Sequence, residues 1–265
     1  MKPPEYNPHW PDDVQRVYRH DMEEIWDRTI APHIWNSYHN QLDLYETIAG
    51  KEELLDILDV GCAQATLALR LAESGHRVTA VDLRQGFIDY AKSRYTHGEI
   101  EFICGNAMEL DFEKSFDLIF ANQLVEHLVY PESLVEHLLE HLKPRGRLVL
   151  STPNGAYIRN TLPSYKKLGD PKRWEHKQFS ADGDGHFFAY RERELAEICE
   201  RAGMAGVQSR IFETPWISGH MKLHYLHRLV PTFVWRVLDK LTLAIPVLGK
   251  RVGHQLLVVG CKKDD

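Results

Sequence analysis

The chain has 265 residues, 43% of them hydrophobic, and a formal net charge of −6. This length suits one elaborated α/β domain with a large core, and the negative charge argues against a general nucleic-acid-binding role. No signal peptide or membrane-spanning run is recognisable, so we expect a cytoplasmic protein. The absence of any CxxC pair predicts buried, reduced thiols rather than a disulfide framework or zinc site, and the four cysteines concerned are Cys62, Cys104, Cys199 and Cys261.

Two helices are predicted before the first strand, over residues 12–27 and 33–48, with Pro32 at the break between them. The second helix carries an aromatic stripe. Such a stripe packs into a core more often than it lines a ligand site. The positions most open to a ligand role are Trp35, Tyr38 and His39.

Residues 57–82 form the most informative segment. An apolar strand runs into a turn of small residues at Gly61, a helix pattern follows, and a second apolar strand ends at Asp82, 21 residues after Gly61. In a nucleotide-binding βαβ unit, the acid that binds the ribose hydroxyls lies about 20 residues beyond the glycine turn. The spacing therefore predicts an adenosine-type cofactor. An ordinary strand–turn–helix without a ligand is the alternative.

The composition of the turn narrows the choice of cofactor. A dinucleotide site would show Gly-x-Gly-x-x-Gly, whereas this turn reads Gly61-Cys62-Ala63-Gln64-Ala65-Thr66. Starting at Asp59, it resembles motif I of the class I S-adenosylmethionine (SAM) methyltransferases, Asp-x-Gly-x-Gly-x-Gly. The sequence departs from that motif at Ala63 and Ala65. Because alanine favours negative φ, we expect a slightly reshaped turn.

The resemblance extends over roughly residues 50–212 and 254–262. It is nearest to the ubiquinone-type O-methyltransferases and the bacterial glycan and natural-product methyltransferases. The segments that carry it after motif I are Gly105-Asn106-Ala107, the strand and loop 116–123, the turn and strand 142–154, and residues 185–190 with the helix that follows.

The resemblance and the alternation of apolar strands with helices imply one architecture. We expect an α/β, doubly wound, Rossmann-like seven-stranded sheet with an antiparallel edge hairpin. Residues 1–50 would form an N-terminal helical lid over the cofactor cleft, and residues 51–265 the methyltransferase domain. Strands are predicted near 55–60, 77–82, 100–104, 115–120, 147–152, 206–212 and 255–261, and core helices near 64–74, 85–96, 131–142 and 192–202.

The family resemblance also implies the cofactor and its contacts. SAM would be held by Asp82 and the neighbouring Leu83 at its ribose, and by Asn106 and Ala107 at its adenine. The methionine part would lie along Asp59, Gly61 and Ala63, with Asp59 reaching the ammonium group directly or through water. Gln123 belongs to the loop that closes over SAM in the family.

A long insertion interrupts the predicted edge hairpin. Residues 214–253 separate strands that a hairpin would join by 2–5 residues, and they include an amphipathic helix over 232–243. The stretch from 215 to 253 contains six basic residues and one acid, a net charge of +5 that leaves −11 for the remainder. A basic amphipathic helix suggests a membrane surface, a lipid-linked substrate or an acidic group. A lid or a dimer interface is the alternative.

The segment after the fourth strand offers a general base. Glu126 and His127 lie where ligands meet the carboxyl ends of the strands, and histidine titrates near neutral pH. The pattern resembles Glu-x-x-Glu-His of the ubiquinone-type and small-RNA 2′-O-methyltransferases, in which a divalent metal is involved. Gln123 replaces the first acid, and an amide is a poorer ligand for a hard cation. We therefore expect no bound metal, His127 as the base and His186 as a second candidate.

Together these features predict SAM-dependent methyl transfer to a hydroxyl of a small-molecule, sugar or natural-product acceptor, by a monomer or homodimer without a nucleic-acid partner. N-methylation would need less help from a base and remains open. The alternatives are a catalytically degenerate SAM-binding protein and a metal-assisted RNA 2′-O-methyltransferase.

Overall fold

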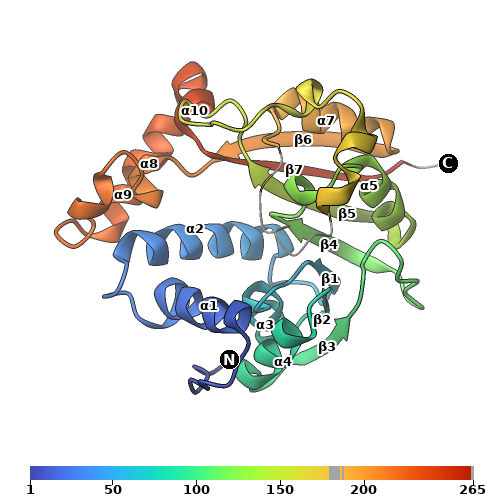
Figure 1. The fold of residues 1–265 in the computed structure, drawn as a ribbon, viewed down its shortest axis with the longest axis horizontal. Helices are drawn as coiled ribbons and strands as arrows, with labels where there is room; N and C mark the ends of the chain where they lie inside the picture. Colours follow the sequence, from blue (N-terminus) through green and yellow to red (C-terminus); the bar gives the residue numbers. More distant parts are fainter. Residues whose placement is uncertain (179–185, 187, 264–265) are drawn as a thin grey trace. The chain divides into compact units, whose positions relative to one another are not determined.

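A computed structural model describes residues 1–178, 186 and 188–263 of the chain (Figure 1). The seven predicted strands form one mixed sheet in the order β3-β2-β1-β4-β5-β7-β6, and the predicted antiparallel edge of β5, β7 and β6 is confirmed. The strands are β1 (Asp56–Val60), β2 (Arg77–Asp82), β3 (Glu99–Cys104), β4 (Phe116–Asn122), β5 (Leu142–Pro153), β6 (Met204–Phe212) and β7 (Gln255–Lys262).

The helices of the core lie where the apolar periodicity predicts them, although most are one to three residues shorter. In chain order the α-helices are α1 (Asp12–Asp21), α2 (Pro32–Ala49), α3 (Thr66–Glu73), α4 (Gln85–Arg94), α5 (Pro131–Glu140), α6 (Glu175–Gln178), α7 (Glu192–Arg201), α8 (Pro215–Ser218), α9 (Thr232–Leu243) and α10 (Pro246–Val252). Among the described residues, no helix combines the length and the apolar character needed to cross a bilayer.

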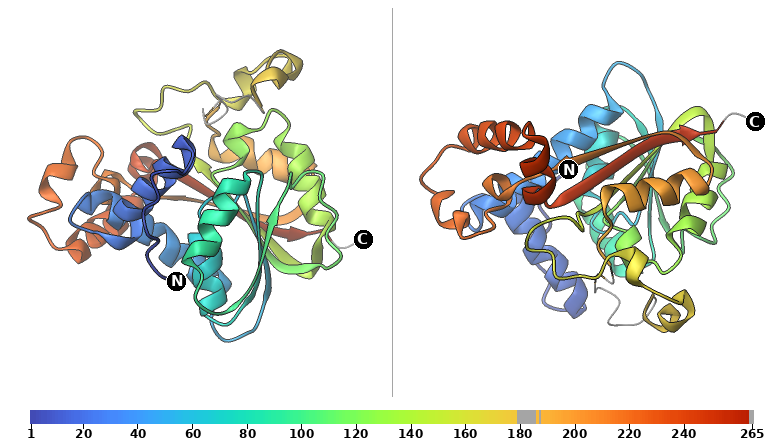
Figure 2. Two further views of the ribbon diagram at one scale, coloured as in Figure 1. Left: turned by 60° about the horizontal axis from the view of Figure 1, so that its bottom comes forward. Right: turned by 90° about the horizontal axis from the view of Figure 1, so that it is seen from above.

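The chain divides into two compact units, which are described separately. The first unit comprises residues 1–111 and 215–240. In it, β2 pairs in parallel with β1 and with β3. The apolar side chains of β1 and β2 are buried, as expected for parallel strands covered on both faces. The α8–α9 segment lies beside α2 (Figures 1 and 2).

The second unit comprises residues 112–214 and 241–265. Here β4 pairs in parallel with β5, and β7 runs antiparallel between β5 and β6. Helix α7 packs on β6 and α5 on β5, as Figure 2 shows from above. Residues 179–185 and 187, which include most of the polar loop before His186, lie outside the described part of the chain.

The cysteine prediction is partly wrong. Cys62 and Cys199 are buried free thiols, whereas Cys104 is exposed and Cys261 is half-buried. Cys104 is the last residue of β3, the outermost strand of the sheet order, where one side of the strand has no neighbour to cover it.

A buried ion pair joins the N-terminal helices to the sheet of the first unit. The guanidinium of Arg94 is wholly buried, with Nη2 2.8 Å from Asp21 Oδ1. Its Nη1 donates hydrogen bonds to the Gln64 carbonyl oxygen (2.6 Å) and the Thr66 hydroxyl (2.9 Å). Asp21 also accepts hydrogen bonds from Trp26 and Tyr90. One arginine therefore links the end of α1, the turn after β1 and the start of α3.

The predicted helix over 12–27 is modified at this network. The α-helix ends at Asp21 and continues as a π-helical turn, η1 (Met22–Trp26). Such turns arise where one extra residue is accommodated in a helix, often at functional sites. The turn carries Trp26 toward the buried Asp21 and Glu24 toward the half-buried Gln64.

Replacing Arg94 with Met should lower the free energy of unfolding by about 3–5 kcal/mol, because the carboxylate of Asp21 would stay buried without its cation. Lys92→Met, at an exposed position of the same helix, should change it by less than about 0.5 kcal/mol. Urea unfolding measures both. If the free energy of unfolding of Arg94→Met lies within about 1 kcal/mol of the parent's, far below the loss expected for a broken buried ion pair, the role of the ion pair is contradicted.

Candidate active site

The turn after β1 keeps the backbone geometry of glycine although alanines occupy it. Gly61, Ala63 and Ala65 have φ values of 69°, 47° and 55°. The expected reshaping of the turn is therefore wrong: both alanines adopt the left-handed conformation, at a cost of about 1–2 kcal/mol each. The methyl group of Ala63 packs against a buried apolar cluster of Val14, Phe87 and Tyr90, and Ala65 is fully buried. These contacts offset part of the strain.

Asp82 fixes this turn from the end of β2. Its Oδ2 accepts a hydrogen bond from the Ala63 amide (2.9 Å) and its Oδ1 one from the Arg84 amide (2.9 Å). Burial raises the pKa of the carboxyl group, and the two amides oppose that rise. A carboxylate oxygen has a second lone pair, so each oxygen can still accept a hydroxyl hydrogen bond. Asp82 therefore fits the ribose role predicted from its spacing.

Asp59 lies under the same turn, on β1. It is buried and accepts a hydrogen bond from the Ala68 amide, and burial raises its pKa to about 7. The charge of Asp82 raises it further. Burial disfavours the charged form of Asp59, and a nearby cation would stabilise that form. The ammonium group of a methionine moiety would be such a cation.

The remaining residues of the first unit that were predicted to contact the cofactor differ in how well their surroundings suit that role. Leu83 exposes an apolar side chain beside Asp82. Asn106 uses its amide locally, since Oδ1 accepts from the Met108 amide and Nδ2 donates to Glu109. A contact with adenine through Asn106 or Ala107 stays a prediction.

Two residues of the N-terminal helices reach this turn. The Gln64 side chain donates to Glu24 Oε2 (3.0 Å) and to the Tyr38 hydroxyl (3.3 Å). Burial and the charge of Asp21 raise the pKa of Glu24 to about 8. The sequence singled out Tyr38 but not Glu24, because the π-helical turn that carries Glu24 inward has no local signature. His39 instead stacks on Trp35, with ring centroids 3.9 Å apart.

The second unit brings together the predicted base residues. Glu126 and His127 lie in a 3₁₀ turn, η2 (Val125–His127), and the rings of His127 and His186 are 5.0 Å apart. Glu126 is fully buried, and burial raises its pKa to about 8. Its Oε2 accepts from the Thr152 hydroxyl, whereas its Oε1 has no hydrogen-bond partner among the described residues and lies 4.0 Å from His186 Nε2.

These three side chains form a donor set that fits a divalent metal. One ligand atom from each of Glu126, His127 and His186 lies within 4.8 Å of the others. Two imidazoles and a carboxylate suit transition metals, and the unpartnered Glu126 Oε1 is available as a ligand. Gln123 is not part of the set, since its amide donates to Ser151 and Gln255. The cluster can thus act as a base alone or hold an ion.

A family profile described as "Methyltransferase domain" matches residues 18–209. The chain belongs to the class I SAM-dependent methyltransferases. The cofactor of this methyltransferase is SAM.

Curated relatives are about a third identical to this methyltransferase over the parts that align. It is 32% identical to the malonyl-[acyl-carrier protein] O-methyltransferase of Priestia megaterium, over 55% of the chain and 52% of that protein. It is also 32% identical to the ubiquinone biosynthesis O-methyltransferase of Rickettsia bellii, over 62% of the chain and 69% of that protein. The chain spans about half the length of the first of these relatives.

Solved structures of other methyltransferases share the fold. The phosphoethanolamine N-methyltransferase 2 of Haemonchus contortus, in complex with SAM, gives a TM-score of 0.59 at 15% identity, covering 93% of this chain and 60% of that one. The magnesium protoporphyrin IX methyltransferase of Synechocystis gives 0.58 at 14% identity, covering 96% of each chain.

The left-handed strain in the turn can be measured with a matched pair of variants. Ala65→Gly and Ala68→Gly each remove one fully buried methyl group, but Ala68 lies within α3. Glycine relieves the strain only at position 65, and at position 68 it adds the cost of a helical glycine, about 0.5–1 kcal/mol. Ala65→Gly should therefore destabilise the protein by about 2–3 kcal/mol less than Ala68→Gly. Urea unfolding gives the difference. A difference of only about 1 kcal/mol, which the helical glycine alone explains, would show that the turn is unstrained.

Asp59→Asn should flatten the dependence of stability on pH. Between its ordinary pKa of 3.8 and its folded pKa of about 7, the folded protein keeps a proton that the unfolded chain releases. The stabilisation is complete below pH 4 and is lost as pH rises through 7, by on the order of 4 kcal/mol. Urea unfolding across this range should show a smaller decline for Asp59→Asn than for the parent or the exposed control Asp89→Asn. Parallel curves for all three would contradict the assignment.

Proposed function

We propose that this methyltransferase transfers the methyl group of SAM to a hydroxyl of a small-molecule, sugar or natural-product acceptor. The observation that supports hydroxyl methylation is the cluster of His127 and His186 beside the buried Glu126. An alcohol or phenol must lose its proton as it attacks, and an imidazole is suited to take it. The names of the curated relatives, both O-methyltransferases, agree with this proposal.

The reaction is a displacement at the sulfonium carbon of SAM. The acceptor oxygen forms a bond to the methyl carbon as the carbon–sulfur bond breaks, and the sulfur leaves as a neutral thioether. Because the leaving group is already activated, the protein contributes mainly by aligning oxygen, carbon and sulfur. Asp59, Asp82 and the turn from Gly61 to Ala65 would hold the cofactor for this alignment.

The proton of the acceptor hydroxyl passes to an imidazole of the cluster, which later returns it to solvent. We assign this role to His127. Burial and the neighbouring His127 lower the pKa of His186, so His186 stays neutral near pH 7 and can accept a hydrogen bond or a proton. A divalent ion bound to Glu126, His127 and His186 would acidify the hydroxyl. The Thr152 hydroxyl orients Glu126 in either case.

His127→Ala should lower turnover by about 10²–10⁴-fold, the usual contribution of a general base, while SAM affinity stays near that of the parent. Turnover is measured as S-adenosylhomocysteine release with a panel of phenols, catechols and sugars, and affinity by calorimetry. His176→Ala, at an exposed histidine of the same unit, is the matched control. Asp82→Ala should show the opposite pattern, losing SAM affinity with the two-hydroxyl contact.

Three results would count against the proposal. Parent-like turnover in His127→Ala would remove the base. SAM binding without turnover on any hydroxyl acceptor would favour a degenerate binding protein, and turnover only on amines would favour N-methylation. Chelation with EDTA and restoration by Mn²⁺ or Mg²⁺ distinguishes the metal-assisted form from a metal-free base.

A further inference from the structure

Helix α9 presents its apolar face to solvent. Trp235 and Asp239, one turn apart, are 4% and 5% exposed. On the opposite side, Phe233, Val237 and Leu241 are 68%, 50% and 62% exposed. These three residues recur at i, i+4 and i+8 and so share one face. The sequence predicts the helix and its amphipathic pattern, but the apolar stripe is not the buried side.

The chain before α9 is equally apolar at its surface. Among the described residues, seventeen large hydrophobic side chains are exposed, and ten of them lie between positions 221 and 248. In the first unit these include Tyr225, 71% exposed, and Leu229, 78% exposed. Exposed apolar side chains concentrated in this way mark an interaction surface. We define the docking surface as Tyr225, Leu229, Phe233 and Val237, with Lys222, Arg228 and Lys240.

The exposed charges of residues 215–253 have one sign. Lys222, Arg228 and Lys240 are exposed, whereas Asp239, the single acid between positions 215 and 253, is buried. Lys240, seven residues after Phe233, lies next to it on the helical wheel, at the edge of the apolar stripe. The exposed charge of this stretch is therefore positive in a chain of net charge −6.

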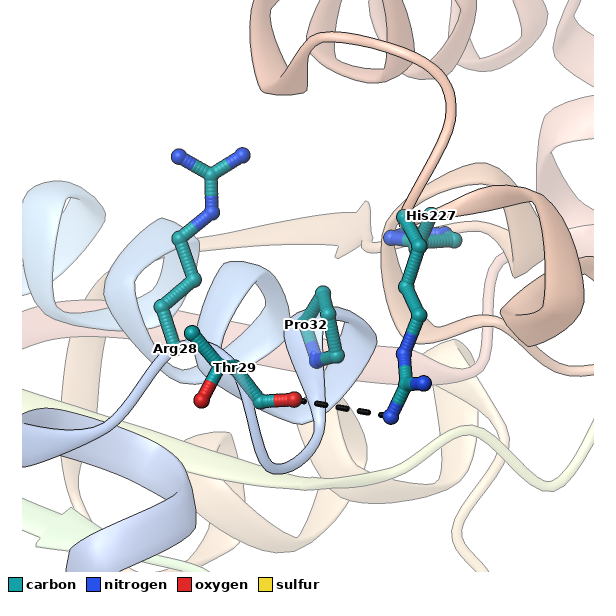
Figure 3. Close-up of a pocket in the computed structure, with 5 residues that line it drawn as sticks. Arg28, Thr29, Pro32 and His227 are labelled. Carbon is teal, nitrogen blue, oxygen red and sulfur yellow. Dashed lines mark hydrogen bonds between the residues drawn. The ribbon is translucent and has the colours of Figure 1, made fainter.

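A pocket of about 500 Å³ opens beside the docking surface, within the first unit (Figure 3). Its lining includes two arginines, Arg28 and Arg228, together with Thr29, Pro32 and His227. Arg228 donates to the Thr29 carbonyl oxygen at 3.5 Å, and Arg28 lies 5.5 Å from the Trp35 ring centroid. Guanidinium groups with several donors each are suited to phosphate oxygens.

A partner that covers the docking surface must offer apolar groups for its hydrophobic side chains and negative charge for its lysines and arginine. A second copy of the chain, docked through the same surface, would bring two positively charged surfaces together, and like charges at an interface are unfavourable. An anionic lipid surface offers hydrocarbon for Phe233 and Leu229 and phosphate for the bases. Tyrosine and phenylalanine beside lysine and arginine are typical of segments that lie in a bilayer interface.

We propose that the docking surface binds peripherally to membranes that contain anionic phospholipids. The apolar face of α9 and the side chains of Tyr225 and Leu229 enter the interface, and an arginine of the pocket, Arg28 or Arg228, meets a lipid phosphate. This surface is distinct from the cofactor turn and from the Glu126 cluster, so the inference does not depend on the proposed acceptor.

Co-sedimentation with phosphatidylcholine vesicles, prepared with and without phosphatidylglycerol, tests the proposal on the full chain. Binding should require phosphatidylglycerol and weaken with salt. The double variant Phe233→Ser/Val237→Ser should lower the partition coefficient by at least about tenfold, since two exposed side chains lose their burial. Lys240→Gln should lower it by about fivefold. The matched controls are Leu54→Ser, at an exposed apolar position of the same unit, and Arg19→Gln.

SAM affinity, measured for each variant, shows that the fold is retained. Vesicle binding that is absent, or that is equal in the parent and Phe233→Ser/Val237→Ser, would overturn the proposal. So would a concentration-dependent dimer in light scattering that this double variant abolishes, because the occupant would then be a second copy. Binding of inorganic phosphate without any vesicle binding would reduce the pocket to a simple anion site and would also overturn the proposal.

Discussion

The guanidinium of Arg94 is the point on which the first unit depends, because three separate segments satisfy their polar groups through it. It neutralises Asp21 at the end of α1, caps the Gln64 carbonyl in the turn after β1 and binds the Thr66 hydroxyl at the start of α3. A fully buried ion pair contributes little net stability but strongly penalises any arrangement that separates its partners. The pair therefore specifies how the N-terminal helices dock on the cofactor turn.

That docking explains how a turn with two alanines keeps its shape. Left-handed alanines are unfavourable in isolation, and such strain persists only where the surroundings over-determine the backbone. Here Asp82 holds the Ala63 amide, Arg94 holds the Gln64 carbonyl, and Val14 from α1 packs on the Ala63 methyl. Contacts from the N-terminal helices thus stabilise a left-handed backbone that glycine would adopt without strain.

The order of strands and helices could be predicted from the sequence because apolar period and turn residues are local signals. The candidate role of Asp82 was predicted from its spacing to Gly61, and that of Asp59 from the family resemblance; both stay predictions. The φ values of Ala63 and Ala65 were predicted wrongly, since residue preference alone ignores the tertiary contacts around them. The proximity of His186 to Glu126, the contact of Glu24 with Gln64 and the burial of Arg94 depend on packing between segments far apart in sequence. The exposure of the apolar side of α9 could not be predicted either, because it depends on which side of the helix packs against the rest of the protein.

The buried acids of the cofactor turn carry a consequence for the heat of binding. Asp59 and Glu24 have pKa values raised to about 7 and about 8, so both hold protons in part near neutral pH. A cofactor that brings a sulfonium and an ammonium group favours their ionised forms. Occupation of the turn by SAM would then expel protons into the buffer. The apparent binding enthalpy would vary with the ionisation enthalpy of the buffer chosen, and its slope would count the protons released.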